Sequence, residues 1–203
     1  QLRVSLSTNV NQDMKDIKLK TDDQIFIIRE MEDNHRMAIS GAAGTGKTVL
    51  AIEKAMILAE NNKRVLLLCF NRPLGSYLKH KLEHLPTITA THFHQFCRDV
   101  AKAAGVKLEG VPQTVLAESL VDNFTEAGLN EYDAIIIDEG QDFSDDWLTT
   151  LEVVVKAGND GVLYIFYDDN QNVMSTSASY IRELPLAKHH LTRNFRNTRS
   201  IFQ

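Results

Sequence analysis

The sequence contains little cysteine and no long hydrophobic run. Its two cysteines, Cys69 and Cys97, provide neither a disulfide framework nor the spacing of a zinc site, which is compatible with a reducing cytoplasm. The longest apolar runs, such as VLLLCF at 65–70, have the length of a strand and are far too short to cross a membrane, and no signal peptide is visible. We therefore expect a cytoplasmic protein that has no membrane partner.

The sequence also lacks an initiating methionine, internal repeats and low-complexity tracts. Its 203 residues, of which 43% are hydrophobic, are enough for one substantial core, so one α/β domain is the default expectation. The missing methionine, a polar opening and an end within a helix-like segment indicate a piece of a longer protein. We expect residues 1–20 to form an extension or linker and residues 21–203 to form one folded lobe.

The net charge of −5 argues against a protein that coats nucleic acid with its whole surface. The charge is unevenly distributed, because residues 61–107 hold eight Lys or Arg and two acids, whereas residues 108–173 hold one Lys and fifteen acids. Such asymmetry is typical of separate surfaces for separate partners, although a solvated helix face explains any one cluster equally well.

Short apolar segments alternate with helix-favouring segments along the chain. Most expected strands are apolar throughout, as strands are when both faces are covered. They lie at 36–40, 64–70, 87–90, 132–138, 161–168 and 189–193. The expected helices lie at 22–33, 47–61, 74–83, 91–104, 114–127 and 145–157. This alternation predicts an α/β fold with a mostly parallel sheet between two layers of helices, in which ligands bind at the carboxyl ends of the strands.

The most specific motif follows the first expected strand. It matches G-x-x-x-x-G-K-[ST] in full, between a strand and a helix, and its residues are Gly41, Ala42, Ala43, Gly44, Thr45, Gly46, Lys47 and Thr48. Its glycines let the loop curl so that backbone N–H groups converge on phosphate oxygens, and the following helix adds its positive N-terminal end. Lys47 would reach the β and γ phosphates of a nucleotide, and the Thr48 hydroxyl would bind Mg²⁺.

Two adjacent carboxylates follow the apolar strand AIII at 134–137. Asp138 suits a contact to Mg²⁺, direct or through water, and Glu139 suits the general base for an attacking water. A solvated turn explains such a pair equally well when it stands alone, but the phosphate loop makes hydrolysis the favoured interpretation. The sequence has no N-K-x-D element, which a GTP-binding switch would usually show.

The order of the motifs resembles the first motor domain of UvrD-like superfamily 1 helicases, over residues 21–203. GAAGTGKT and DEGQD resemble motifs I and II, YDDNQ at 167–171 resembles motif III, and LTRNFRNT at 191–198 resembles motif IV. CFNRPLGSYL at 69–78 and TATHFHQF at 89–96 resemble motifs Ia and Ib, which touch single-stranded nucleic acid in that family. The resemblance implies a RecA-like P-loop NTPase fold.

The resemblance also implies roles for single residues. Gln171 would sense the γ-phosphate, Phe195 would stack on adenine, and Arg196 would act as an arginine finger. Gln24 would contact the adenine edge and make ATP the preferred nucleotide, although residues 21–24 also fit a helix capping box. ATP and Mg²⁺ are therefore the implied cofactors.

The residues at the ends of the second and third strands are candidate contacts to single-stranded DNA or RNA. They are Phe70, Asn71, Arg72, His92 and Phe93, and we expect them at the same edge of the sheet as the phosphate loop. Aromatic rings offer stacking platforms and Arg72 offers phosphate neutralisation. The helical spacing of Phe93 and Phe96 leaves a core position open for Phe93 and favours it for Phe96.

Departures from the family pattern limit the expected activity. Val49 stands where the family usually has Arg, the segment after YDDNQ offers only Tyr180 as an aromatic residue, and motifs V and VI are absent from the sequence. We therefore expect slow ATP hydrolysis and no duplex unwinding by this piece, with the second motor lobe of the full protein as its missing partner.

Two other functions remain open at this point. In a nucleotide-gated binding module, ATP would change the affinity for nucleic acid or protein with little turnover, and the intact Glu139 and Gln171 argue modestly against it. In a P-loop kinase, phosphate would pass to a small molecule, and such an enzyme needs an acceptor pocket and lid arginines rather than D-E-x-Q-D. Stimulation of ATP hydrolysis by single-stranded nucleic acid would distinguish these possibilities.

Overall fold

The computed structural model describes residues 22–107, 109–110, 112, 115, 120, 132–155, 161–169 and 176–192. The chain divides into two units, residues 1–33 and 34–203. In the first unit, helix α2 (Asp22–Asp33) has the bounds that the sequence predicts. Within the described residues, no helix has both the length and the apolar character needed to cross a bilayer.

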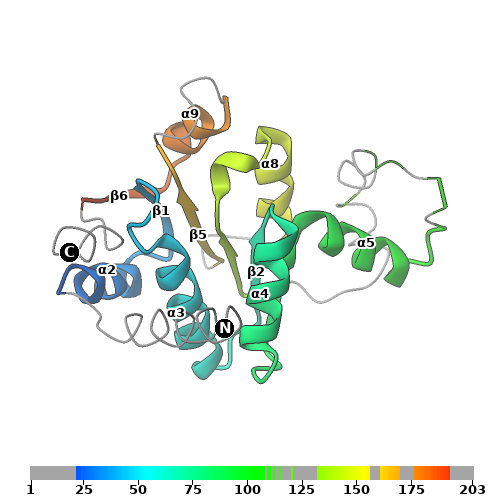
Figure 1. The fold of residues 1–203 in the computed structure, drawn as a ribbon, viewed down its shortest axis with the longest axis horizontal. Coiled ribbons are helices and arrows are strands. Elements are labelled where there is room, and N and C mark those ends of the chain that lie inside the picture. The colour runs from blue at the N-terminus through cyan, green and yellow to red at the C-terminus, as the bar shows by residue number, and fades with distance from the viewer. Residues whose placement is uncertain are drawn as a thin grey trace, which may run out of the picture. The chain divides into compact units, whose positions relative to one another are not determined.

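Six parallel strands of the described residues form the centre of the second unit (Figure 1). They are β1 (Arg36–Gly41), β2 (Val65–Cys69), β3 (Ile88–His92), β4 (Ala134–Ile137), β5 (Val162–Tyr167) and β6 (Ala187–Leu191). Their order across the sheet is β3-β2-β4-β5-β1-β6, and all five pairings are parallel. The four inner strands are buried almost throughout, which is why their sequences are continuous apolar runs.

Helices cover both faces of this sheet and give three layers (Figure 1). One face carries α3 (Lys47–Glu60) and α4 (Arg72–Leu82). The other carries α5 (Phe93–Ala103), α8 (Asp145–Val154), α9 (Thr176–Glu183) and the 3-10 turn η1 (Gly140–Asp142). Apolar side chains of α5, α8 and α9 form one buried cluster with alternate residues of the strands, such as Leu66, Ile135 and Leu163. The predicted α/β class with a parallel sheet and flanking helices is confirmed.

The predicted element bounds differ most near the carboxyl end. Strand β6 runs two residues earlier than predicted, and α9 was not expected because its sequence, TSASYIRE, has too few apolar residues to show a helical period. Of the predicted helix 114–127, the structure describes Val115 and Leu120, and both are helical.

The strand order places three loops side by side. Because all strands are parallel, their carboxyl ends share one edge, and β5 lies between β4 and β1. The loop that follows β5 therefore lies between the phosphate loop after β1 and the carboxylates after β4. Ligands of open α/β sheets bind at this edge.

Candidate functional site

The loop after β1 has the backbone conformation of an anion-binding loop. Gly44 and Gly46 have φ values of 88° and 84°, which residues with a Cβ atom rarely adopt. Gly46 is the N-cap of α3, so the free N–H groups at the start of this helix lie at the loop. The Thr45 hydroxyl closes the turn by donating to the Ala42 carbonyl at 2.8 Å. The expected strand–loop–helix arrangement around residues 41–48 is confirmed.

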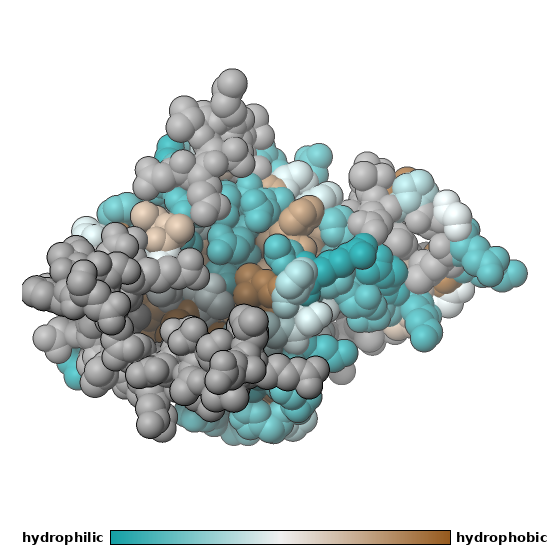
Figure 2. Space-filling model, in the orientation of Figure 1, coloured by the Kyte–Doolittle hydropathy of each residue, from teal (hydrophilic) through white to brown (hydrophobic). Residues whose placement is uncertain are grey.

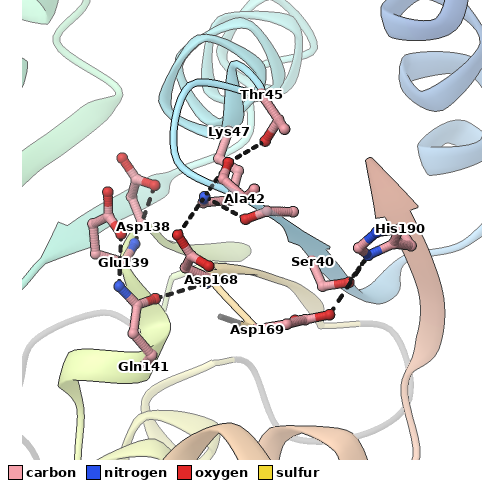
Figure 3. A network of polar contacts seen from close by, with 11 residues as sticks. Ser40, Ala42, Thr45, Lys47, Asp138, Glu139, Gln141, Asp168, Asp169 and His190 are labelled. Carbon is pink, nitrogen blue, oxygen red and sulfur yellow. Dashed lines mark hydrogen bonds and ion pairs between the residues drawn. The ribbon is translucent and has the colours of Figure 1, made fainter. Parts of the chain in front are cut away.

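Lys47 is folded against this loop (Figure 3). Its ammonium group donates to the carbonyl oxygens of Gly41 at 2.7 Å and Ala42 at 3.2 Å, and lies 3.9 Å from Oδ2 of Asp168. The side chains of Lys47 and Asp168 are 6% and 1% exposed, so solvent screens this ion pair little. A phosphate oxygen is a stronger acceptor than a neutral carbonyl, and Lys47 is placed to exchange one for the other.

Asp138 lies at the same edge, directly after β4, and is fully buried. Burial raises the pKa of Asp138 to about 6, although a hydrogen bond from the Thr48 side chain opposes this rise. Its Oδ2 atom has no hydrogen-bond partner among the described residues. A buried acceptor without a partner beside a hydroxyl group suits a hard divalent cation, so Asp138 and Thr48 fit the predicted Mg²⁺. The described residues contain no group of three or more His, Cys, Asp or Glu that could hold a metal ion.

The raised pKa of Asp138 predicts a pH-dependent change in stability. The folded chain binds the Asp138 proton more tightly than the unfolded chain, so the free energy of unfolding falls as the pH rises from about 4 to about 6 and stays lower above it. That pKa difference corresponds to about 3 kcal/mol. In EDTA and without nucleotide, Asp138→Asn should therefore raise the midpoint of urea unfolding more at pH 7.5 than at pH 4.5.

The exposed carboxylate of Asp146 provides the control for this measurement. Asp146→Asn should raise the midpoint at pH 7.5 by less than Asp138→Asn does, because its side chain is exposed to water. If Asp138→Asn gave the same change at pH 4.5 and pH 7.5, the raised pKa would be contradicted.

Glu139 is held in an unusual backbone conformation. Its φ and ψ of 55° and 48° are left-handed, which costs a residue with a Cβ atom about 1–2 kcal/mol. Its N–H donates to Oδ1 of Asp138 at 3.1 Å, and its own carboxylate accepts from the Gln141 amide at 2.7 Å. Gln141 in turn accepts the N–H of Asp168 at 2.9 Å. Contacts therefore run without a break from Glu139 through Gln141 and Asp168 to Lys47 (Figure 3).

The sequence alone predicts no role for Gln141 or Asp168, although Gln141 lies in DEGQD and Asp168 lies in YDDNQ. In each motif, the only indication of a role is one polar residue close to a residue with a known function in the family. Their link depends on β5 lying between β4 and β1, which the motifs do not encode. The structure therefore adds these two residues to the candidate site.

A second polar cluster lies beside the phosphate loop (Figure 3). Ser40 Oγ lies 2.8 Å from Nδ1 of His190, and Asp169 Oδ2 lies 3.5 Å from the same nitrogen. A Ser-His-Asp relay needs the two ring nitrogens for its two partners. Because both contacts use Nδ1, this cluster is not arranged for nucleophilic catalysis, and it links β1, β6 and the end of β5.

The candidate nucleic-acid contacts after β2 are accessible. Phe70 is partly exposed, and Asn71 and Arg72 are exposed. Asn71 also has a local role, because its side chain caps α4 by accepting the N–H of Leu74 at 3.2 Å. These three residues lie at the same edge of the sheet as the phosphate loop, as the sequence predicts.

The candidates after β3 are mostly structural. His92 is buried, and its Nδ1 caps α5 by accepting the N–H of Gln95 at 3.3 Å. Phe93 is fully buried, so the core position that its spacing left open is the one it occupies. Phe96 is also in the core, as expected. The predicted stacking role of Phe93 is therefore wrong, because its ring has no exposed face on which a base could stack. The ring packs instead against His94 and Trp147.

Four predicted nucleotide contacts are not tested by this geometry. Gln171, Phe195 and Arg196 lie outside the described residues. For Gln24, which lies in α2, the structure describes the backbone and not the side chain. Their roles stay predictions.

The family of the chain follows from a comparison with known proteins. Residues 34–200 match the family model described as Schlafen group 3, DNA/RNA helicase domain. The chain belongs to this family. A search of curated proteins gives no match.

Solved structures with the same architecture include Pif1 helicase from Candida albicans, with 20% sequence identity, a TM-score of 0.61, and coverage of 88% of this chain and 41% of that chain. Two further structures are more distant. AMPPCP-bound DnaA from Aquifex aeolicus has 11% sequence identity and a TM-score of 0.47, with coverage of 88% of this chain and 50% of that chain. Bacteroides Pif1 bound to ssDNA has 16% sequence identity and a TM-score of 0.45, with coverage of 89% of this chain and 43% of that chain. The first likeness confirms the RecA-like fold. This chain spans half or less of the length of each of these proteins. The UvrD-like assignment is finer than these findings and stays a prediction.

Proposed function

We propose that this member of the Schlafen group 3 helicase domain family is the ATP-hydrolysing motor lobe of a superfamily 1 helicase of UvrD-like type. It would act on single-stranded nucleic acid together with a second motor lobe of the full protein. The observation that carries the proposal is the unbroken series of contacts between Lys47 on the phosphate loop and Glu139 after β4. It brings a cation for phosphate and a base for water to one edge of the sheet.

We assign each part of the hydrolysis reaction to particular residues of the chain. The amides of residues 41–48 and Lys47 would bind the triphosphate, and Asp138 with Thr48 would hold Mg²⁺, which would neutralise charge at the phosphates. Water attacks the γ-phosphorus, the bond to the bridging β–γ oxygen breaks, and Glu139 accepts the proton of the water. The hydrogen bond from Gln141 fixes the direction of the Glu139 carboxylate.

Four further residues complete the proposed nucleotide site, and three more are proposed for the nucleic acid. Gln171 would help to orient the water, and Arg196 would offset charge on the transferring phosphoryl group, a contribution of about 10³–10⁵ in rate when an arginine finger is in place. Phe195 and Gln24 would bind adenine. Phe70, Asn71 and Arg72 are proposed contacts to the nucleic acid, which is supported by their exposure and by the DNA/RNA helicase description of the family.

Phosphate release and oligonucleotide binding test this function together. We expect slow, Mg²⁺-dependent release of phosphate from ATP by the wild-type chain, and faster release with single-stranded oligo(dT) or oligo(U). The measurements are a coupled phosphate assay and the anisotropy of a labelled oligonucleotide. If the chain bound neither a fluorescent ATP analogue nor an oligonucleotide, the proposal would be wrong. If ATP shifted the oligonucleotide affinity without any phosphate release, the chain would be a nucleotide-gated binding module.

A further inference from the structure

Five aromatic rings from three separate segments meet near the carboxyl ends of β2 and β3. Phe93 and Phe143 are buried at the base of this group, with exposed fractions of 0% and 1%. Phe70, His94 and Trp147 lie above them and are partly exposed. We refer to these three rings as the aromatic rim. Two of the three stand in the segments that resemble motifs Ia and Ib, whereas Trp147 comes from α8, after the DEGQD motif.

Trp147 touches each part of this group. Its ring lies 6.0 Å from Phe70 with an interplanar angle of 18°, 4.9 Å from Phe93, and 5.3 Å edge-on from His94. Its backbone N–H donates to the Ser144 side chain, the N-cap of α8, at 3.4 Å. A ring that is already held by three others loses little conformational freedom when it binds a ligand. The rim is therefore pre-organised.

The charges around the rim differ between its two sides. Arg72 lies two residues after Phe70, at the start of α4. Arg98 lies on α5 four residues, or about one helical turn, after His94. Burial and the positive charges of these two arginines lower the pKa of His94. Asp145 and Asp146 directly precede Trp147 in the first turn of α8. The α4–α5 side is thus cationic and the α8 side is acidic. A nucleotide has the matching asymmetry, since its phosphate is anionic and its base offers N–H donors.

The size of the apolar surface also favours a small, flat ligand. On the face that Figure 2 shows, the described residues are mostly hydrophilic and the hydrophobic areas are small. Large hydrophobic side chains that are more than a third exposed are limited, among the described residues, to Tyr77 and Val115. A stable interface with another protein usually needs a broader area than this. A single base needs only one or two rings.

We propose that the aromatic rim, with Trp147 as its central ring, stacks on a base of single-stranded nucleic acid, whose phosphate lies toward Arg72 and Arg98. This inference rests on the proposed function and adds a contact that none of the quoted motifs assigns. Trp147 lies eight residues after Glu139 on the same segment. A base bound at the rim would therefore contact the segment that carries the proposed general base.

The single tryptophan of the chain makes the test direct. Tryptophan emission of the wild-type chain should change saturably with unlabelled oligo(dT) or oligo(U), with the midpoint that anisotropy gives for the labelled strand. Trp147→Leu should weaken binding by about fivefold or more, which is the lower end of the effect of losing one stacking ring. Trp147→Phe should keep most of the affinity. His84→Leu removes an exposed ring outside this group and outside the segments that resemble motifs Ia and Ib, and should stay within about twofold of wild type.

The outcomes separate this inference from the proposed function. If anisotropy showed strand binding, but tryptophan emission did not change and Trp147→Leu bound normally, the stacking role of the aromatic rim would be overturned. The proposed function would still stand. Absence of strand binding would overturn both. An emission change with an aromatic peptide but with no oligonucleotide would identify a protein-binding surface and overturn the inference. Thermal unfolding and ATP-analogue binding of each variant show whether a loss reflects misfolding, and the milder Trp147→Phe variant keeps the test valid in that case.

Discussion

Glu139→Gln is expected to abolish phosphate release from ATP while Mg-ATP still binds. The amide has the shape of the carboxylate and its oxygen still accepts the hydrogen bond from Gln141, which the structure shows at 2.7 Å. It cannot take a proton from the attacking water. Loss of a general base lowers the rate by about 10²–10⁴. Steady-state phosphate release gives kcat, and a fluorescent ATP analogue gives the affinity, which we expect within about threefold of wild type.

Asp142→Asn is the matched control, because Asp142 is the third acidic residue of DEGQD, after Asp138 and Glu139, and its side chain is exposed. The pKa of Asp142 is raised by partial desolvation of its carboxyl and by the nearby charge of Glu139, so the two groups share one electrostatic environment. We expect this variant to keep its phosphate release. Normal release in Glu139→Gln, or an equal loss in Asp142→Asn, would show that Glu139 is not the base.

The sequence predicts the parts of the fold that depend on local chemistry. The continuous apolar runs of β2, β4 and β5 identify strands that are covered on both faces, and the glycine pattern at 41–48 identifies a loop with left-handed positions. Both signals lie within a few neighbouring residues. Helix α9 was not predicted and β6 lies two residues earlier than predicted, because their sequences are too polar to show a strong period.

The sequence does not predict contacts that depend on strand order. Gln141 reaches Asp168 only because β5 lies beside β4, and the two residues are 27 positions apart. Phe93 and Phe70 both follow strands, and the sequence suggests stacking for both. Their packing distinguishes them, because Phe93 is buried beneath the aromatic rim and Phe70 is a partly exposed member of it. Trp147 joins them from a helix whose sequence gives no sign of this neighbour. Such contacts follow from tertiary structure, and residue patterns do not carry them.

The phosphate loop itself is tested by Lys47→Ala, for which we expect a loss of ATP-analogue affinity of at least about 100-fold. The ammonium group makes charge-assisted hydrogen bonds, worth about 1.5–3 kcal/mol each, and the β and γ phosphates offer two acceptors. In the structure, the carbonyl oxygens of Gly41 and Ala42 accept hydrogen bonds from this group at 2.7 and 3.2 Å. Lys63→Ala, which removes an exposed lysine after α3, should bind like wild type.

A loss of binding in Lys47→Ala has two possible causes, because the change also removes the cation 3.9 Å from the buried Asp168 carboxylate. Removing one partner of a buried ion pair destabilises a protein by about 3–5 kcal/mol. The double variant Lys47→Ala with Asp168→Asn removes both charges and should recover most of the unfolding free energy in urea. If it recovers stability and still fails to bind the analogue, the missing contribution is the contact of Lys47 with phosphate. If it recovers binding as well, the loop does not use Lys47 to bind the nucleotide.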